Sequence, residues 1–536
     1  MTTTLEGVMH PQSSIHTSPL GRATLGDQLR RHARTIGDKP AFISYSADGT
    51  RDVCTYRDLD ERAARFAHAL LDRGVRRGDR IAVMARNGIE TVIAYYGALK
   101  VGAAFSGINV LFGAREVGDQ LAHLEPAVVV AGAEFTAVVD ATRSRWLSSS
   151  YLVIGGESSE DWISFEAALA DSGSTEPDCD VDEHDLAMIV YTSGTEAAPK
   201  GVMITHRNYL ISTAPAWSWG LRTQPDDVWL YVMPFHTIAG IGSMTTLTMM
   251  GATLVLPAST EAGRSLEMIR DEGITVIAQT PTFYISLSNH PLFAAETVGT
   301  VQRCMTYGGQ VSPHAIAAWS AAAPSVVWGT YWGQSELSQL GAVGWFRTLE
   351  DIPDQDPTWI GKPVSHLEIR VVDAEGNDAE SGELICRSPS VMSGYFKDPE
   401  RTAATLRDGW VHTGDIVRQD EAGNLFFLDR SKDMIKTGGL NVSSQEVERA
   451  LQSHPDVVRA AVVGLPDEYW SEVVTGFVMV KPDSSTSEEE LRVYCRDQLA
   501  NYKVPKAINI VEELPVDPQG KLLKRELRRV HGGVRS

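Results

Sequence analysis

The sequence predicts an α/β protein that has a large, layered N-terminal domain and a small C-terminal α+β domain. Its 536 residues exceed what one hydrophobic core normally covers, so at least two domains are expected. Helical and strand-like patterns alternate from about residue 41 to residue 415, which is typical of layered α/β domains with largely parallel sheets. Near Arg430 the pattern changes to that of a smaller unit.

The elements of the large domain follow from hydrophobic periodicity. A first helix carries its apolar residues on one face and meets Gly74 where it should end. The residues of that face are Leu59, Ala63, Phe66 and Leu70. A strand over 81–84, a helix over 90–100 and a strand over 127–130 come next. Residues 186–190 are short, apolar and partly β-branched, which predicts a buried strand.

The uncharged run from residue 238 to residue 256 has almost the length of a membrane span. Glycines and threonines interrupt it, and residues 251–257 have the pattern of a turn and a strand. We therefore expect a buried helix followed by a core strand, with a transmembrane segment as the weaker alternative.

The small domain is predicted to hold strands over 460–463 and 473–480, a helix over 488–499 and a basic tail. We expect the division to fall between residues 1–429 and residues 430–536. The charged segment 429–433 is the candidate hinge, because charged residues favour exposure.

Composition excludes several classes of protein. The net charge of -21 and the pI near 5.1 argue against nucleic acid or an anionic membrane as the main partner. The five cysteines lie far apart without a C-x-x-C pair, which predicts reduced structural thiols and neither a zinc site nor a disulfide framework. Residues 1–20 lack the basic and apolar regions of a signal peptide, so the cytoplasm is the expected location.

Residues 191–201, YTSGTEAAPKG, place hydroxyls, glycines and a lysine in one turn after the strand over 186–190. Gly194 and Gly201 allow backbone N–H groups to turn toward phosphate oxygens. Additional donors come from the side chains of Thr192, Ser193, Thr195 and Lys200. The spacing differs from that of a Walker loop. The segment predicts a triphosphate-binding loop, and an ordinary polar turn is the alternative.

This segment closely resembles the phosphate loop of the adenylate-forming superfamily, which includes acyl-CoA synthetases, aryl-CoA ligases, adenylation domains and luciferases. Glu196 and Ala197 stand where the family usually has Thr-Gly. A carboxylate about 5 Å from a phosphate opposes binding unless it points to solvent or reaches Mg²⁺. ATP remains the expected nucleotide.

Further motifs follow in the superfamily's order, over nearly the whole chain. Residues 233–237, MPFHT, resemble the segment at the acid-binding pocket, and residues 307–310, YGGQ, resemble the turn beside adenine. Residues 330–336, TYWGQSE, resemble the Tyr-Gly-x-Thr-Glu segment, with Trp332 and Ser335 as the substitutions.

The resemblance implies roles for these segments. Adenine would lie against Gly308, Gly309, Gln310, Tyr331 and Trp332. Ser335 would contact the α-phosphate and Glu336 would hold Mg²⁺, which prefers carboxylate oxygens. The acid pocket would be lined by His236, Ile238, Ala239, Gly240, Tyr307, Gly308, Trp332 and Gln334.

Residues 382–384 and 394–395 resemble structural markers of the family, and residues 410–415, WVHTGD, resemble its ribose-binding segment. Asp415 would accept hydrogen bonds from both ribose hydroxyls, because a carboxylate offers two acceptor oxygens. We interpret His412 as a structural histidine.

The last two motifs belong to the hinge and the tail. In residues 428–439, which resemble the hinge and the loop after it, Arg430 would reach the ribose or phosphates and Lys432 would be the pivot. Gly438 and Gly439 would let pantetheine pass close to the backbone. Lys436 matches a position used in the second half-reaction, with a solvated lysine as the alternative. Lys521, in the segment 518–525, would bridge the substrate carboxylate and the α-phosphate.

The implied activity is ATP-dependent conversion of a fatty or aryl carboxylic acid to acyl-AMP with release of pyrophosphate, followed by transfer to coenzyme A. ATP, Mg²⁺ and CoA are the implied cofactors and co-substrates, with Lys200, Glu336, Lys436 and Lys521 as catalytic residues. The resemblance also implies that the small C-terminal domain is mobile and rotates between the two steps.

Amino-acid-activating relatives usually carry aspartate at the position of His236, so an apolar or aromatic acid is favoured over an α-amino acid. Three alternatives stay open. The acceptor is a carrier-protein thiol, the acid is an unusual small oxyanion, or the protein is a non-catalytic nucleotide-binding homologue. Monomer and homodimer are equally open.

Overall fold

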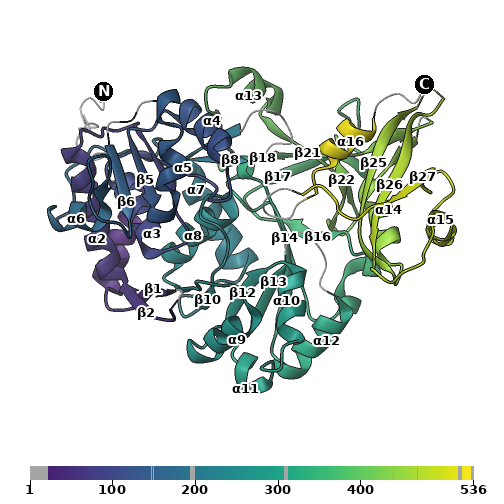
Figure 1. Cartoon of the computed structure of the whole chain (residues 1–536), viewed down its shortest axis with the longest axis horizontal. Coiled ribbons are helices and arrows are strands. Elements are labelled where there is room, and N and C mark those ends of the chain that lie inside the picture. Colours follow the sequence, from purple (N-terminus) through teal and green to yellow (C-terminus); the bar gives the residue numbers. More distant parts are fainter. Residues whose placement is uncertain are drawn as a thin grey trace, which may run out of the picture.

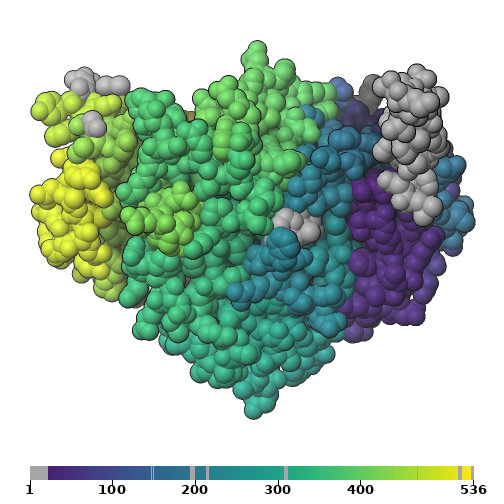
Figure 2. Space-filling model, turned by 180° about the vertical axis from the view of Figure 1, so that it is seen from behind, coloured from purple at the N-terminus to yellow at the C-terminus, as the bar shows by residue number. Residues whose placement is uncertain are grey.

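The computed structural model describes residues 22–46, 48–146, 148, 150–192, 200–306, 312–438, 440–467, 469–516 and 522–532. Figure 1 shows a large lobe, coloured from purple to green, beside a small yellow lobe formed by the C-terminal residues. Seen from behind, the small lobe packs against the green part of the large one (Figure 2). The predicted combination of a large α/β part with a C-terminal α+β unit is confirmed.

The first sheet of the large lobe has the strand order β19-β9-β8-β4-β3-β5-β6-β7. From β8 to β7 all neighbours are parallel, and β8, β9 and β19 pair antiparallel. Its strands are β3 (Arg80–Met84), β4 (Ala104–Gly107), β5 (Val128–Gly132), β6 (Ser150–Ile154), β7 (Ile163–Ser164), β8 (Leu186–Thr192), β9 (Lys200–Thr205) and β19 (Gly394–Tyr395).

Helices cover both faces of this sheet because its strands are apolar on both sides. In β3, Ile81 and Val83 face the core under α2 and α3, whereas Ala82 and Met84 face the core under α4. The predicted helix face of α2 is fully buried, and Gly74 follows with a φ of 77°. The helices are α2 (Tyr56–Asp72), α3 (Ile89–Lys100), α4 (Ala114–Leu124), α5 (Thr136–Asp140) and α6 (Phe165–Ala170).

The second sheet runs in the order β2-β1-β11-β10-β12-β13-β14-β15-β16-β22-β21-β18-β17. Strands β1, β11, β10, β12, β13 and β14 are parallel neighbours. Their bounds are β1 (Pro40–Tyr45), β2 (Arg51–Thr55), β10 (Val228–Leu230), β11 (Thr253–Leu256), β12 (Val276–Gln279), β13 (Arg303–Thr306) and β14 (Val327–Trp332).

The expectation of largely parallel sheets up to residue 415 is wrong for residues 342–415, and the antiparallel pairing continues to residue 430. These strands pair antiparallel, and β21 alternates buried and partly exposed residues, the pattern of a sheet with one solvated face. They are β15 (Ala342–Phe346), β16 (Trp359–Pro363), β17 (Glu368–Val372), β18 (Ser381–Arg387), β20 (Leu406–Arg407), β21 (Trp410–Gln419) and β22 (Leu425–Arg430).

The segment 238–256 folds as a short π-helix (Ile238–Gly242), α8 (Ser243–Met250) and β11, which confirms the buried helix and core strand. Across the described part of the chain, no helix has both the length and the apolar character needed to cross a membrane. The other helices of the large lobe are α7 (His206–Thr213), a π-helix (Ala214–Gly220), α9 (Ala262–Asp271), α10 (Pro281–Ser288), α11 (Ala295–Val298), α12 (Pro313–Ala322) and α13 (Pro399–Thr405).

The small lobe holds a sheet in the order β24-β23-β26-β25, with β27 added beside β26. The predicted strands over 460–463 and 473–480 lie in β25 and β26, and the predicted helix begins at Glu488 but ends at Arg496. The elements are β23 (Ile435–Thr437), β24 (Leu440–Val442), α14 (Ser444–Gln452), β25 (Val457–Asp467), β26 (Ser471–Val480), α15 (Glu488–Arg496), β27 (Ala507–Ile510) and α16 (Lys524–His531). The division between residues 429 and 430 stays a prediction; it falls at the end of β22.

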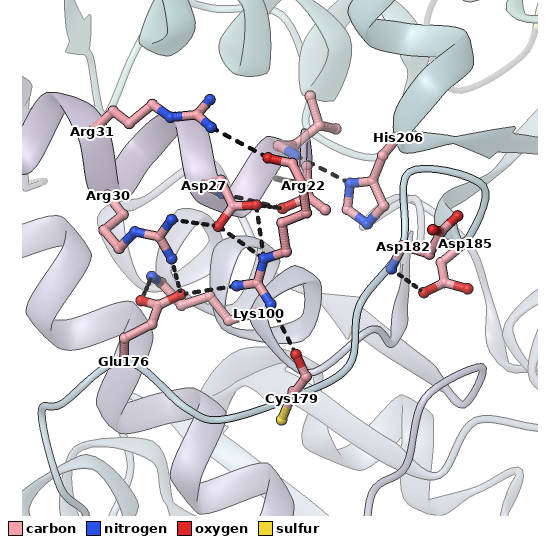
Figure 3. Close-up of polar contacts among 12 residues, drawn as sticks. Arg22, Asp27, Arg30, Arg31, Lys100, Glu176, Cys179, Asp182, Asp185 and His206 are labelled. Carbon is pink, nitrogen blue, oxygen red and sulfur yellow. Dashed lines mark hydrogen bonds and ion pairs between the residues drawn. The ribbon is translucent and has the colours of Figure 1, made fainter. Parts of the chain in front are cut away.

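Buried charges hold the first helix, α1 (Leu25–Thr35), against the large lobe (Figure 3). Asp27 is fully buried; it accepts from Arg22 Nε at 2.9 Å and from Thr24 Oγ1 at 2.8 Å, and Arg30 lies 2.8 Å away. Beside it Glu176 pairs with Arg30 and with the buried Lys100. We call these residues the α1 ion cluster. All five cysteines are unpaired, as the sequence predicts.

Candidate active site

The strongest candidate site lies where the two sheets of the large lobe present the carboxyl ends of their parallel strands, the usual ligand position in α/β folds. On the first sheet, β8 ends at Thr192, which pairs with Lys200 at the start of β9. Residues 193–199 connect these strands and lie outside the described residues, so the predictions for Ser193, Gly194 and Thr195 and the Glu196–Ala197 departure stay untested.

Beside this connection, Tyr395 contacts both Lys200 and Glu336. Lys200 Nζ stands 5.7 Å from the centre of the Tyr395 ring, within the range of a cation–π interaction. The Tyr395 hydroxyl donates to Glu336 Oε1 at 2.8 Å. Burial, the Glu336 charge and this hydrogen bond raise the pKa of Tyr395, so it remains a neutral donor at physiological pH. The structure thus brings the loop lysine close to the carboxylate predicted to hold a metal.

Asp415 is the centre of a second cluster, formed by strands β14, β21 and β22. Its Oδ2 accepts from Trp332 Nε1 at 2.8 Å and from Gln334 Nε2 at 2.7 Å, and Arg430 Nε lies 2.6 Å from Oδ1. The Oδ1 atom is buried, yet the alignment of Arg430 gives it no hydrogen bond among the described residues. Burial raises the pKa of Asp415 above its ordinary value, and Arg430 only partly opposes this shift.

A layer of neighbouring groups fixes the backbone that carries Asp415. Glu383 accepts from the Gly414 N–H at 3.0 Å and contacts His412 Nδ1 at 2.9 Å. Thr413 Oγ1 donates to the Leu384 carbonyl at 2.5 Å and accepts from the Asp415 N–H at 3.1 Å. His412 therefore makes a bracing contact outside the Asp415 cluster, in agreement with its interpretation as a structural histidine.

The segment around His236 is anchored to the first sheet by Asn87. The Asn87 side chain donates to the Met233 carbonyl at 2.8 Å and accepts from the Phe235 N–H at 3.0 Å. A Cβ at Gly107, at the end of β4, would stand 2.5 Å from His236 Cα, so this approach requires glycine. Burial lowers the pKa of His236 to about 4, so its ring is neutral at physiological pH. Sequence reasoning missed Asn87, although a polar residue just after a parallel strand was an available signal.

Gly240 allows the following turn to close on this segment. A Cβ there would stand 1.8 Å from the Pro234 carbonyl oxygen, which no rearrangement of side chains could relieve. Thr237 Oγ1 donates to the same carbonyl at 2.9 Å and accepts from the Gly240 N–H at 3.0 Å. Ile238 and Ala239 begin the short π-helix next to it.

A narrow interior gap, which we call the inner cavity, lies behind these residues. Its lining residues leave no space for a water-sized molecule in this structure. Ala278, Met305 and Tyr331 come from the carboxyl ends of β12, β13 and β14. The other lining residues are Trp217, Leu221, Trp229, Met233, Ser243, Gln339 and Leu340. Tyr331 and the segment that contains Met233 were singled out in the sequence, whereas the other lining residues were not, because their proximity depends on the pairing of distant strands.

At the start of the predicted hinge, Asp429 makes contacts to the small lobe. Its buried carboxylate accepts from the Ser444 N–H and from Ser444 Oγ, both at 2.6 Å, at the beginning of α14. Lys432 is exposed. Lys436 lies exposed on β23, where its N–H donates to Glu472 at 2.7 Å. Gly438 has a φ of 58°.

Several predicted site residues lie outside the described residues: Tyr307, Gly308, Gly309, Gln310, Gly439 and Lys521. Of the remaining ones, the structure brings together Trp332, Gln334, Asp415 and Arg430 around one end of the second sheet, whereas Tyr331 lines the inner cavity. Ser335 is buried beside Glu336 in the turn after β14.

Glu336 is the carboxylate of this site that could bind a metal ion. Within the described ranges, no three His, Cys, Asp or Glu side chains come together as a ready-made metal site. Glu336 offers a partly buried carboxylate whose Oε1 already has a donor in Tyr395. A single carboxylate fits Mg²⁺, which is often held by one or two carboxylates together with substrate phosphates.

Comparison with known proteins decides the family. Residues 29–396 match the AMP-binding enzyme family, and residues 446–521 match the AMP-binding enzyme C-terminal domain. The chain belongs to the family of AMP-binding enzymes.

Among the relatives of this AMP-binding enzyme is the long-chain-fatty-acid–CoA ligase of Bacillus subtilis (strain 168), which is 30% identical over 97% of this chain and 96% of the relative. The anthranilate CoA ligase AuaEII, solved with anthranoyl-AMP, superposes with a TM-score of 0.83 at 26% identity, covering 95% and 97% of the two chains. The amide bond synthetase McbA from Marinactinospora thermotolerans gives 0.79 at 26% identity, covering 94% and 100%. This AMP-binding enzyme is an acid–thiol ligase.

Proposed function

We propose that this AMP-binding enzyme converts an apolar or aromatic carboxylic acid to its acyl-AMP and then passes the acyl group to coenzyme A. The observation that carries the proposal is the juxtaposition of the Asp415 cluster with the contacts from Lys200 to Glu336. One cluster suits the ribose of a nucleotide and the other suits its phosphates and a cation.

The ribose end of the nucleotide is assigned to Asp415 and Arg430. Oδ1 of Asp415 is buried without a hydrogen bond, so a ribose hydroxyl would supply the donor that the protein does not. Trp332 and Gln334 already hold Oδ2, which keeps the carboxylate in one orientation. Arg430, whose side chain is 42% exposed, can turn toward phosphate oxygens when a hydroxyl takes its place.

The phosphate end is assigned to Thr192, Lys200, Ser335 and Glu336. A carboxylate is a poor acyl donor, so the acid must first become a mixed anhydride with AMP as leaving group. Mg²⁺ would neutralise phosphate charge when bound to Glu336. Lys200 would contribute a cation on the same side, and Tyr395 would hold Glu336 in place.

The remaining residues keep the roles that the resemblance implies. Lys521 would stabilise charge as pyrophosphate leaves, Lys432 would be the pivot for a rotation of the small lobe, and Lys436 would serve the second step. The exposed pair Tyr469 and Trp470 adjoins Gly438 and offers an aromatic surface to an incoming CoA.

We propose an apolar acid because the residues that line the inner cavity are mostly apolar. Most of this lining is aromatic or aliphatic, and Met233, from the same segment as the neutral His236, is part of that lining. A neutral ring lacks the negative charge that would balance the ammonium of an α-amino acid. The named relatives act on acids of both kinds that we consider, a long-chain fatty acid and an aryl acid. The cytoplasm remains the predicted location, and the five unpaired cysteines suit a reducing compartment.

The test is a pyrophosphate-release screen with ATP, Mg²⁺ and a panel of alkyl, aryl and amino acids, followed by CoA addition and detection of the thioester. We expect release with apolar or aryl acids and thioester only when CoA is present. Binding of ATP without release for any acid would contradict the proposal and favour a non-catalytic homologue.

A second candidate concerns the acceptor. McbA, an amide bond synthetase, shares this fold over nearly the whole chain, so the fold itself does not select a CoA thiol. A carrier-protein thiol would then take the acyl group, and an amine acceptor, as the name of McbA suggests for that protein, is the contrasting outcome. The same assay distinguishes these acceptors: acyl-AMP that persists with CoA but disappears with a carrier protein supports the second candidate, whereas disappearance with an amine alone contradicts it.

A further inference from the structure

The inner cavity contains a buried hydrogen-bond donor with no acceptor. Trp229, on β10, is 1% exposed and its indole lines the cavity. Its Nε1 is buried and has no hydrogen-bond partner among the described residues. An unpaired buried donor destabilises the folded protein, so most native structures pair such groups.

The neighbouring polar groups of the cavity satisfy one another. Gln339 Nε2 donates to Ser243 Oγ at 2.6 Å, and its Oε1 accepts from the Tyr209 hydroxyl at 2.9 Å. Tyr209 also contacts Thr246 Oγ1 at 2.9 Å. Gln339 and Ser243 thus have hydrogen-bond partners, whereas the Trp229 N–H, which belongs to the same lining, has none in the described part of the chain.

Trp328 has a second indole N–H without an acceptor among the described residues, but it lies away from the inner cavity. Trp328 Nε1 on β14 is also buried without a partner. The Trp328 side chain, however, packs among apolar residues on the opposite side of the sheet, against Tyr284 and Trp319, and does not line the inner cavity. Of these two unpaired indoles, Trp229 is therefore the one that a molecule entering the inner cavity would contact.

Water does not supply the missing acceptor, because the inner cavity has no space for a water-sized molecule. A bound acyl group would have to open it. Met233 and Met305 line the cavity, and methionine side chains adapt readily to a new neighbour. The group that opens the cavity would then also bring the acceptor.

We propose that the Trp229 N–H donates to an oxygen on the acyl part of the substrate, which makes Trp229 a residue that selects oxygen-bearing apolar acids. This inference rests on the proposed function, since it names a property of the acid that the enzyme activates. The oxygen is a carbonyl, ether or hydroxyl group placed away from the reacting carboxylate. Acids without it would leave the donor unpaired and bind less tightly.

The test compares matched pairs of alkyl and aryl acids that share a skeleton and differ only by one acyl oxygen. Pyrophosphate release gives kcat/KM for each acid with the wild-type chain, Trp229→Phe and Trp328→Phe. Phenylalanine keeps an aromatic ring and removes the N–H. We expect the wild-type enzyme to favour the oxygenated member of at least one pair by about tenfold, the value of one neutral hydrogen bond.

The Trp229→Phe variant should reduce this ratio to about one, mainly through KM, whereas Trp328→Phe should leave it unchanged. A ratio that survives in Trp229→Phe, or that falls equally in both variants, overturns the inference. If Trp229→Phe does not fold, the wild-type ratios decide: a ratio near one in every pair overturns it. Pyrophosphate release without preference leaves the proposed function intact, whereas no release from any acid contradicts the proposed function itself.

Discussion

Asp27 and Asp415 are both fully buried aspartates, yet their surroundings shift their pKa values in opposite directions. Burial raises the pKa of Asp27, but the hydrogen bonds and charges of Arg22, Thr24 and Arg30 outweigh it, and the net shift is downward. For Asp415 burial prevails over Arg430, Trp332 and Gln334, and the pKa is raised.

The difference separates a structural carboxylate from one that is left for a ligand. Both oxygens of Asp27 have well-placed donors from the protein, whereas Oδ1 of Asp415 has none that is aligned. The Asp415 charge is therefore unfavourable in the protein alone, as expected where a substrate supplies the missing hydrogen-bond donor.

The largest effect is expected for Asp27→Asn. Removing this charge leaves the buried Arg22 and Arg30 with Glu176 as their remaining carboxylate, which should lower the free energy of unfolding by about 3–5 kcal/mol. Chemical denaturation measures the change. Asp38→Asn removes one half of an exposed pair with Arg57 and should cost less than about 1 kcal/mol. Equal effects of the two substitutions would mean that the α1 ion cluster is no more important than a surface pair.

A pH effect of about 3 kcal/mol is expected from His206, which accepts from the Leu25 N–H at 3.2 Å beside the cluster. Burial lowers its pKa to about 4, so the unfolded chain takes up a proton first as the pH falls. Stability should therefore decrease between about pH 6.5 and pH 4. His206→Asn should flatten that slope without removing it, because burial also lowers the pKa of His236 and His366 to about 4.

Thermal unfolding across this pH range measures the slope. His184→Asn, at an exposed position, is the control. Below the ordinary pKa of Asp27, loss of that charge should add a second decrease of stability. An unchanged slope in His206→Asn would show that the buried ring does not link protonation to unfolding.

Asp415→Asn tests the other side of the comparison. Loss of the charge-assisted hydrogen bond from ribose to Oδ1 should lower kcat/KM for ATP about 100-fold. The stability should stay the same or increase, because an under-compensated buried charge is removed. Asp420→Asn, in the turn between β21 and β22, is the control for pyrophosphate release. Strong destabilisation with normal ATP kinetics would reverse the assignment of the two aspartates.

The smallest effect is expected for Tyr395→Phe, which removes the hydroxyl that donates to Glu336. The Mg²⁺ concentration that gives half-maximal pyrophosphate release should increase about tenfold. Tyr45→Phe removes a comparable hydroxyl contact with Glu272, far along the second sheet, and should leave the Mg²⁺ dependence unchanged. An identical Mg²⁺ titration in all three proteins would argue against Glu336 as the metal ligand.

Local patterns predicted the elements of the fold well where packing agrees with periodicity. The buried face of α2, the end at Gly74 and the strands β3, β8 and β26 all follow from apolar spacing. The antiparallel region 342–430 did not follow, because pairing between β16 and β22 joins segments that share no local signal. The α1 ion cluster was missed for the same reason, since Asp27, Lys100 and Glu176 come from distant parts of the chain.

Linear motifs predicted part of the site. Trp332, Gln334, Asp415 and Arg430 were each singled out along the chain, and the structure places them in contact. The motifs did not reveal the residues that hold the site residues in place or those that line the interior behind them. Asn87, the Tyr395 hydroxyl and the lining of the inner cavity act through contacts that exist only after the two sheets have packed.

The carboxylate of Asp429 has a consequence for movement. Asp429 belongs to β22 of the large lobe and precedes Lys432, whereas its donors at Ser444 follow Lys432 and belong to α14. A rotation of the small lobe about Lys432 would break the hydrogen bonds from Ser444 and leave the buried Asp429 carboxylate without them. These hydrogen bonds therefore stabilise the present arrangement of the two lobes. Ligands that favour another arrangement must bind it tightly enough to offset their loss.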